Sequence, residues 1–97
     1  MPKTTIQTDQ AARIAKRLTN HFKHKVAVTE TDAGYFVNMA GADVTFTPTD
    51  SELHIEYVRN ESTDSPERPY DEERLRFVIT DHLDRMAGET FEYHWSE

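Results

Sequence analysis

Three histidines are the residues of this chain best suited to chemistry. His21 and His24 lie three positions apart in a basic segment, and His82 lies near the other end of the chain. Side chains three positions apart on a helix are neighbours about one turn apart, so the first two imidazoles can reach a common ligand. Zinc, other divalent metals and iron bind such pairs when a third ligand is close. The spacing therefore predicts a histidine cluster, with His21, His24 and His82 as candidate metal ligands.

Three basic residues belong to the same candidate cluster. Lys25 follows the first histidine pair, Arg17 precedes it on the same helical flank, and Arg85 lies one turn after His82. A histidine on an apolar helical stripe is more often structural, with its ring nitrogens bonded to the backbone or to a carboxylate. The cluster is therefore a structural feature, a metal site or a site for another ligand, and the residue types alone allow all three.

Several classes of site are excluded by composition. The chain has no cysteine, which excludes disulfides, iron–sulfur clusters and thiol nucleophiles. Its three glycines lie too far apart for a phosphate-binding loop. None of the four serines lies at a strand-to-helix turn of the kind that serine hydrolases use.

The charge distribution narrows the range of partners. The net charge is -7, although residues 10–25 carry five basic residues and no acidic one. An acidic protein repels phosphate backbones, so we expect no nucleic-acid binding. The first ten residues lack the apolar segment of a secretory signal, and the longest aliphatic or aromatic run, residues 77–79, is too short to cross a bilayer. We therefore expect a cytoplasmic protein that does not associate with membranes.

Two amphipathic helices are predicted to position the histidines. Over residues 11–25, apolar side chains recur at the spacing of one helical face, and His21 borders that face while His24 lies farther toward solvent. A second helix is predicted to begin at Asp71 and to end before Gly88, with His82 inside its apolar stripe. If these two faces pack together, His21 and His82 lie at their junction.

The remaining segments alternate apolar and polar residues, as strands do. Strands are predicted over residues 3–8, 26–29, 35–39, 44–46, 53–57 and 91–95. Residues 59–69 lack any period and predict a mobile loop. The predicted order is β-α-β-β-β-β-α-β in a single domain over residues 1–97. Two helices can cover one face of such a sheet, so we predict an α+β two-layer sandwich with a mostly antiparallel sheet.

Several short pieces of this chain, taken together, resemble a bacterial family called domain of unknown function 2218. In order and spacing they are RIAKRL at 13–18, HFKHK at 21–25, Gly41, HLDRM at 82–86, and Trp95. The resemblance extends over nearly the whole chain and implies a small stand-alone α+β domain, with two helices on one face in a layout like that of the TATA-binding protein. The family pattern carries the same three histidines and Trp95. This chain differs in having Met86 in place of a usual phenylalanine, and in a longer 59–69 loop.

The resemblance implies little about activity, because the family is named for having none assigned. It implies an association with flavin-dependent siderophore-interacting proteins, which would be partners in iron acquisition. Such an association gives no mechanism.

The leading hypothesis is a non-enzymatic accessory or binding domain, linked to siderophore or iron utilisation, with a polar cluster of His21, His24 and His82 between the helices. One alternative is a small enzyme in which a histidine acts as general base beside Asp81 or Asp84, which requires a pocket at that histidine. The other is a homo-oligomer or protein-interaction module that uses the polar face of the sheet.

Overall fold

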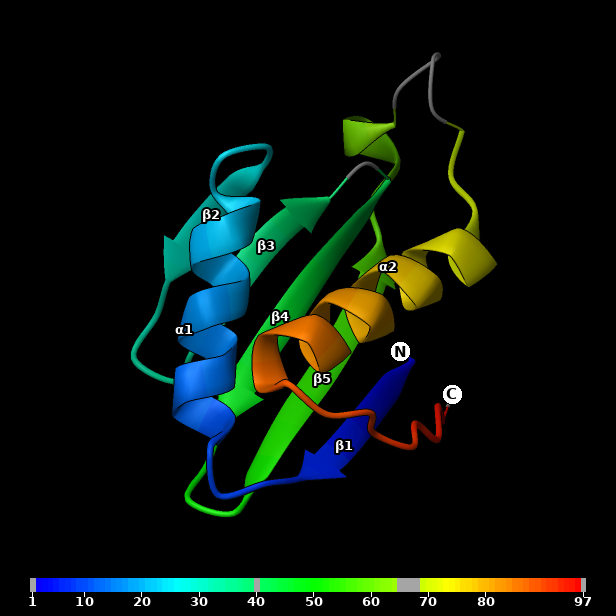
Figure 1. Cartoon of the computed structure of the whole chain (residues 1–97). Coiled ribbons are helices and arrows are strands. Elements are labelled where there is room, and N and C mark those ends of the chain that lie inside the picture. The colour runs from blue at the N-terminus through cyan, green and yellow to red at the C-terminus, as the bar shows by residue number, and fades with distance from the viewer. Residues whose placement is uncertain (1, 40, 65–68, 97) are drawn as a thin grey trace.

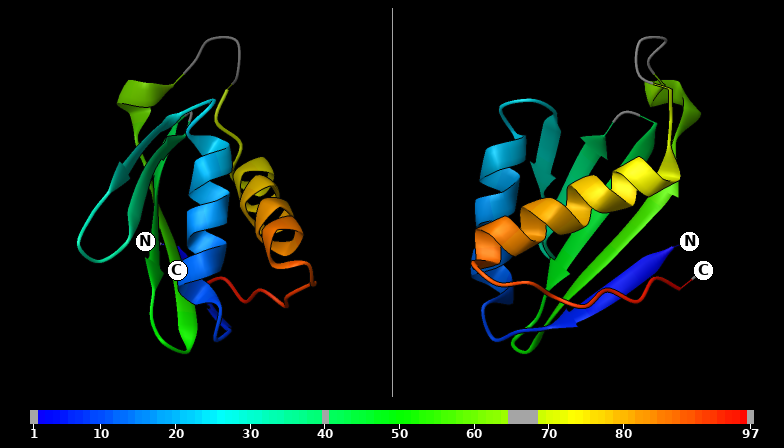
Figure 2. Two further views of the ribbon diagram at one scale, coloured as in Figure 1. Left: turned by 60° about the vertical axis from the view of Figure 1, so that its left-hand side comes forward. Right: turned by 45° about the vertical axis from the view of Figure 1, so that its right-hand side comes forward.

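The protein is a five-stranded antiparallel sheet with two helices on one face. The computed structural model describes residues 2–39, 41–64 and 69–96. The elements, in chain order, are β1 (Lys3–Gln7), α1 (Ala11–Phe22), β2 (Ala27–Glu30), β3 (Tyr35–Met39), β4 (Ala42–Pro48), β5 (Glu52–Arg59), the short 3-10 helix η1 (Glu61–Thr63) and α2 (Glu72–Ala87). Figures 1 and 2 show α1 and α2 lying together against the sheet. The predicted α+β two-layer fold is therefore confirmed.

The strand order is β1-β5-β4-β3-β2, so the strands from β2 to β5 form a meander and β1 completes the far edge. α1 carries the chain from β1 across the face of the sheet to β2 at the opposite edge (Figure 1). In the register, Val37 pairs with Val44 and Val44 pairs with Tyr57, which brings three buried side chains to the helix-covered face. The two-residue period of the strands thus produces one apolar and one polar face.

One hydrophobic core lies between the sheet and the helices. Its fully enclosed members come from every layer: Ala15 and Leu18 from α1, Val37, Ala42, Val44, Phe46, Leu53 and Ile55 from the sheet, and Ile79 and Leu83 from α2. Because both helices contribute to the same core, their polar borders are held next to each other above it.

α1 is three residues shorter than predicted. It ends at Phe22, and residues 23–25 form a turn in which the Phe22 carbonyl accepts hydrogen bonds from the backbone N–H groups of Lys25 and Val26. The prediction that the helix continues to Lys25 is wrong because β2 begins at Ala27, so the chain must leave the helix axis within a few residues. His24 consequently lies on a turn and not on the helix.

α2 has a defined cap at each end. The Asp71 carboxylate accepts a hydrogen bond from the Arg74 N–H at the N-terminus, and Gly88 takes a left-handed conformation (φ 73°) after the last turn. Both limits agree with those expected from the sequence.

The last predicted strand is not formed. Residues 89–96 run as an extended segment beside β1 (Figure 2), and Ser96 pairs with Lys3 in an isolated bridge. The prediction is wrong because this segment is held by its side chains, with Tyr93 bonded to Asp84 on α2 and Trp95 packed on Tyr57. The alternation of aromatic residues therefore reflects anchoring and not a sheet ladder.

The predicted mobile loop over residues 59–69 is described only in part. Arg59 closes β5 and residues 61–63 form η1, whereas residues 65–68 lie outside the described residues, so the mobility stays a prediction. Within the described ranges, no helix has the length and apolar character needed to cross a bilayer.

Candidate functional site

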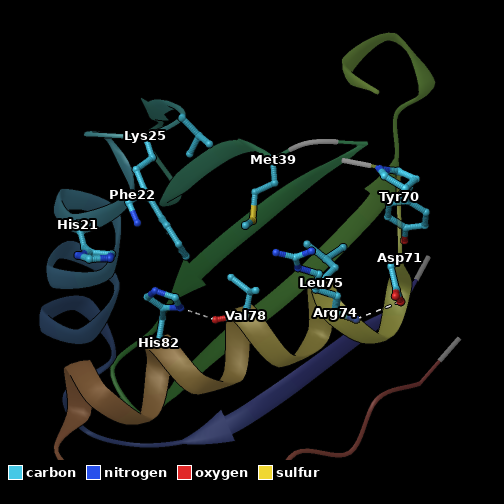
Figure 3. Close-up of a pocket in the computed structure, with 12 residues that line it drawn as sticks. His21, Phe22, Lys25, Met39, Tyr70, Asp71, Arg74, Leu75, Val78 and His82 are labelled. Atoms are coloured by element: carbon cyan, nitrogen blue, oxygen red, sulfur yellow. Dashed lines mark hydrogen bonds between the residues drawn. The ribbon is translucent and has the colours of Figure 1, made fainter. Parts of the chain in front are cut away.

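A pocket of about 320 Å³ opens between the end of α1, the inner side of α2 and the end of β3. Figure 3 shows the side chains that surround it. Its described lining consists of His21, Phe22, Lys25, Val26, Met39, Pro69, Tyr70, Asp71, Arg74, Leu75, Val78 and His82. The pocket therefore includes two of the three histidines selected from the sequence.

The two imidazoles meet at one end of the pocket. The ring centroids of His21 and His82 lie 5.1 Å apart with 40° between the ring planes, and the Phe22 ring lies 5.1 Å from His82. The three rings form a continuous aromatic wall contributed by both helices.

A backbone hydrogen bond fixes the tautomer of His82. Its Nδ1 lies 2.7 Å from the Val78 carbonyl oxygen, one turn back on α2 (Figure 3). A carbonyl oxygen only accepts, so Nδ1 carries the proton. In the neutral ring, Nε2 is then unprotonated and acts as an acceptor. In the imidazolium, both nitrogens donate.

The surroundings of His21 disfavour its charged form. Burial lowers the pKa of His21 below its ordinary value of 6.5, because a charged imidazole loses hydration there. Neighbouring positive charges lower the pKa further, in decreasing order those of His82, Lys25, His24 and Arg85. This end of the pocket therefore has a positive electrostatic environment in a protein whose net charge is -7.

Of the other four predicted site residues, one lines the pocket and three are not among its described lining residues. Lys25 lines the pocket from the turn after α1. Arg85 forms an ion pair with Asp81 at 3.3 Å. Its positive charge contributes to lowering the pKa of His21. His24 and Arg17 are exposed and are not among the described lining residues. The structure thus brings together His21, His82 and Lys25.

The described residues contain no set of three histidine or acidic side chains that could hold a metal ion. The geometry gives the proposed His21, His24 and His82 ligand set no support, because the exposed His24 lies on the turn that follows α1. The proposed pairing of His82 with Asp81 or Asp84 is likewise not formed in the described part of the chain. Asp81 pairs with Arg85, and Asp84 accepts hydrogen bonds from the Tyr93 hydroxyl and the Phe91 N–H.

Sequence reasoning missed the opposite end of the pocket, which consists of Tyr70, Asp71 and Arg74. The available signal was the position of an aromatic residue directly before a helix N-terminus. Tyr70 is held from behind by Arg59, whose guanidinium lies 4.2 Å from the centre of the Tyr70 ring. Arg59 in turn donates to the Gly41 carbonyl at 2.7 Å and to the Asp64 carboxylate at 2.9 Å.

Gly41 allows this support to pack closely. Its φ of +82° favours glycine, and a Cβ at this position would lie 2.8 Å from the Arg59 guanidinium and 3.0 Å from the Tyr70 Cβ. The glycine is therefore required by the turn, and it also leaves room for Arg59 and Tyr70 in the pocket wall.

Comparisons with known proteins find matches over nearly the whole chain but assign no reaction. The model of a family described as "Uncharacterized protein conserved in bacteria (DUF2218)" matches residues 3–96. The chain is similar to the NMR structure of PA4090 from Pseudomonas aeruginosa, with 27% sequence identity, a TM-score of 0.69, and coverage of 98% of this chain and 93% of that chain. The comparison with curated proteins gave no match.

Proposed function

This chain belongs to the DUF2218 family of bacterial proteins, and we propose that it is a non-enzymatic binding domain whose ligand is a small organic molecule held in the pocket between α1 and α2. The observation that carries the proposal is the lining of the pocket. Apolar side chains form its middle, and polar groups that can orient a ligand lie at both ends. Ligand sites in proteins typically have this composition.

The size of the pocket limits the ligand. About 320 Å³ is at the low end of the range of about 300–1,000 Å³ for small-molecule sites. A single ring system or a short acyl chain would fill the pocket, whereas a dinucleotide cofactor would be too large for it.

The polar groups favour binding over catalysis. In the histidine–carboxylate arrangement considered above, a carboxylate stabilises the imidazolium that forms when the histidine removes a proton. His82 uses Nδ1 to bind its own helix backbone, and in the described part of the chain neither Asp81 nor Asp84 bonds to it. In this arrangement His21 and His82 can still donate to or accept from a bound ligand without a carboxylate partner.

A fragment screen by NMR tests this proposal. The Met39, Leu75 and Val78 methyl groups line the pocket, and their signals should shift with at least some fragments of neutral, anionic and cationic classes. The half-buried Val78 changed to Phe fills the pocket and should abolish these shifts. The exposed Asn20 of α1 changed to Phe is the matched control and should leave them intact. A library in which no fragment moves the pocket methyls would refute the proposal.

We propose further that this domain serves siderophore or iron utilisation through the organic chelator and not through the bare ion. The support is that the described residues offer no three-ligand metal group. Iron-free catecholate added to the protein should shift the pocket methyl signals, whereas Fe(III) or Zn(II) alone should leave the His21 and His82 ring signals unchanged apart from non-specific broadening. Stoichiometric metal shifts at both rings would contradict this.

A further inference from the structure

We infer that the ligand is an organic monocarboxylate with an apolar body, bound with its carboxylate at the His21–His82 end of the pocket, and that binding is coupled to uptake of one proton by the imidazole pair. The inference rests on the proposed function, because it assigns the chemical class of ligand for the same pocket. It draws on three features of the pocket: the distribution of charge along it, the protonation of the histidines and the apolar middle.

The two ends of the pocket differ in charge. At the first end, His21, His82 and Lys25 can each present a positive charge, and no acid among the described lining residues lies there. At the other end, Arg74 is accompanied by the carboxylate of Asp71. Asp71 is eleven residues from His82 on α2, a separation of about 16 Å along the helix at about 1.5 Å per residue. An anion is therefore favoured at the histidine end and opposed by Asp71 at the other.

The end of α1 does not cancel this preference. Carbonyl groups at a helix C-terminus carry partial negative charge and would repel an anion. Here the Thr19 carbonyl accepts from the Lys23 N–H, and the Phe22 carbonyl accepts from the N–H groups of Lys25 and Val26. These hydrogen bonds satisfy two of the carbonyls at the end of α1. The full positive charge of Lys25 also exceeds the partial charge of about −0.5 at a helix C-terminus.

The protonation of the histidine pair couples to the ligand. With Nδ1 of His82 donating to Val78, only its Nε2 can exchange a proton with the pocket. In the free protein, burial and neighbouring positive charges favour a neutral His21. The charged groups that face it are His82 and Arg85 from α2 and His24 and Lys25 from the turn after α1.

A bound carboxylate adds a negative charge beside these rings and stabilises an imidazolium. The proton comes from the buffer and stays on a ring nitrogen, whose N–H then donates to a carboxylate oxygen. No bond of the ligand is broken.

The apolar middle of the pocket selects the body of the ligand. Leu75 and Val78 of α2 lie between the two ends, Phe22 forms part of the wall, and Met39 projects from β3 (Figure 3). Methionine is unbranched and adapts to different shapes, so either an aromatic ring or an acyl chain can lie against it. The shared chemistry is an apolar carboxylate. The test below distinguishes the two kinds of body.

The test is calorimetric titration at pH 7 with two matched pairs of compounds: 2-naphthoate with 2-naphthamide, and octanoate with octanamide. At least one carboxylate should bind about tenfold or more tightly than its amide, since an amide cannot stabilise the imidazolium. Repeating the titration in two buffers of different ionisation enthalpy should give proton uptake for the carboxylate and none for the amide. The tighter of the two carboxylates identifies the ligand body as aromatic or aliphatic.

Variants assign the effect to the pair. His82→Gln and His21→Gln should each weaken carboxylate binding about tenfold and leave amide binding unchanged, with the fold checked by the dispersion of the amide NMR spectrum. If a histidine variant fails to fold, Lys25→Gln replaces it in the test, because Lys25 is exposed and its substitution should not affect folding. This variant should weaken binding of the carboxylate and leave binding of the amide unchanged. His54→Gln is the matched control and should bind like the unmodified protein, because His54 lies on the opposite face of the sheet, bonded to Thr5, and is not among the described lining residues.

The outcomes separate this inference from the proposed function. Equal binding of carboxylate and amide in the pocket, or carboxylate binding without proton uptake, overturns the inference and leaves the binding domain standing. Failure of all four compounds to bind also overturns the inference. The fragment screen described above then decides whether the pocket binds any small molecule.

Discussion

The imidazole of His21 on α1 lies 5.1 Å from that of His82 on α2, measured between ring centroids, although 61 positions separate the two residues in the chain. The His82 ring therefore contributes to the electrostatic environment of His21, and a positive charge on it lowers the pKa of His21. We therefore expect the junction of the helices to respond to pH.

Stability should fall as the pH falls below about 6.5, in part because of His21. Its pKa in the folded protein is lowered, chiefly by burial, whereas in the unfolded chain it has its ordinary value. The unfolded state then binds the proton more readily, so this contribution is present above pH 6.5 and is lost as the pH decreases below it. Urea unfolding at pH 7.5 and pH 5.5 should show a smaller loss of unfolding free energy for His21→Gln than for the unmodified protein.

The control for this comparison is His54→Gln on the opposite face of the sheet. His54 bonds to Thr5 and lies near Glu52, away from the pocket. This variant should retain the part of the pH dependence that His21→Gln removes. Equal pH dependence in the unmodified protein and in His21→Gln would show that protonation of His21 is not opposed in the folded state.

Gly41→Ala should destabilise the protein more than Gly88→Ala does. Both glycines have positive φ, so alanine carries a backbone cost of about 1–2 kcal/mol at either position. At Gly88 no atom lies within 4 Å of the added Cβ, whereas at Gly41 the Cβ meets Arg59 and Tyr70. Crowding should add about 1–3 kcal/mol at Gly41. Chemical denaturation measures both variants, and equal losses would show that the Arg59–Tyr70 support yields easily.

The apolar periodicity of the chain was enough to predict the two layers and the meeting of His21 with His82. Each helix face contains several apolar residues that can be buried only against the sheet, and the angular position of His21 and His82 beside those residues follows from helix geometry. The buried status of Ile14, Leu18 and Ile79 bears this out. The site was predictable to this extent because it lies on regular elements.

The parts that sequence missed depend on contacts between distant segments. The end of α1 is set by the start of β2, which the helical period does not report. The residues after Gly88 alternate like a strand, but Asp84 and Tyr57 supply anchors for their side chains. Tyr70 enters the pocket wall because Arg59 holds its ring, a pairing with no sequence period. Each of these features follows from three-dimensional packing.

Tyr57→Phe should reduce the unfolding free energy at pH 7 by about 1–2 kcal/mol. The buried hydroxyl donates to the Glu72 carboxylate at 2.7 Å and accepts from the Arg76 guanidinium at 2.6 Å, so it links β5 to the first turns of α2. The matched control is Tyr35→Phe. Tyr35 is half-buried and its hydroxyl makes no hydrogen bond within the described residues, so its loss should be near zero.

The same hydroxyl should also affect stability at high pH. Burial, reinforced by the bond to Glu72, raises the pKa of Tyr57 to about 12. The unfolded chain releases this proton near its ordinary value of 10, so the contribution is present below pH 10 and is lost as the pH rises toward 12. Stability measured between pH 9 and pH 11 should therefore fall less in Tyr57→Phe than in the unmodified protein. A steeper fall in the variant would contradict the assignment.

Trp95→Ala should release the extended C-terminal segment from the sheet. The Trp95 ring packs edge-on against Tyr57 with 5.4 Å between centroids, and the Arg76 guanidinium lies 5.1 Å from its centre. The side chain is half-buried, so we expect a loss of about 2 kcal/mol, less than the 3–5 kcal/mol typical of a fully buried tryptophan. Circular dichroism during urea unfolding measures this, since the variant lacks the single tryptophan of the chain.

Hydrogen exchange locates the effect of this substitution. The amides of Lys3 and Ser96 each donate to the other residue's carbonyl, at 2.9 and 2.8 Å, and this bridge depends on Trp95 holding the segment beside β1. In Trp95→Ala these two amides should exchange faster by a larger factor than those of β4 in the sheet centre. The exposed neighbour His94 changed to Ala removes only a surface contact with Glu92 and should leave both rates unchanged. Uniform acceleration throughout the sheet would mean that Trp95 stabilises the whole core, and the C-terminal segment would then be an integral layer of the fold.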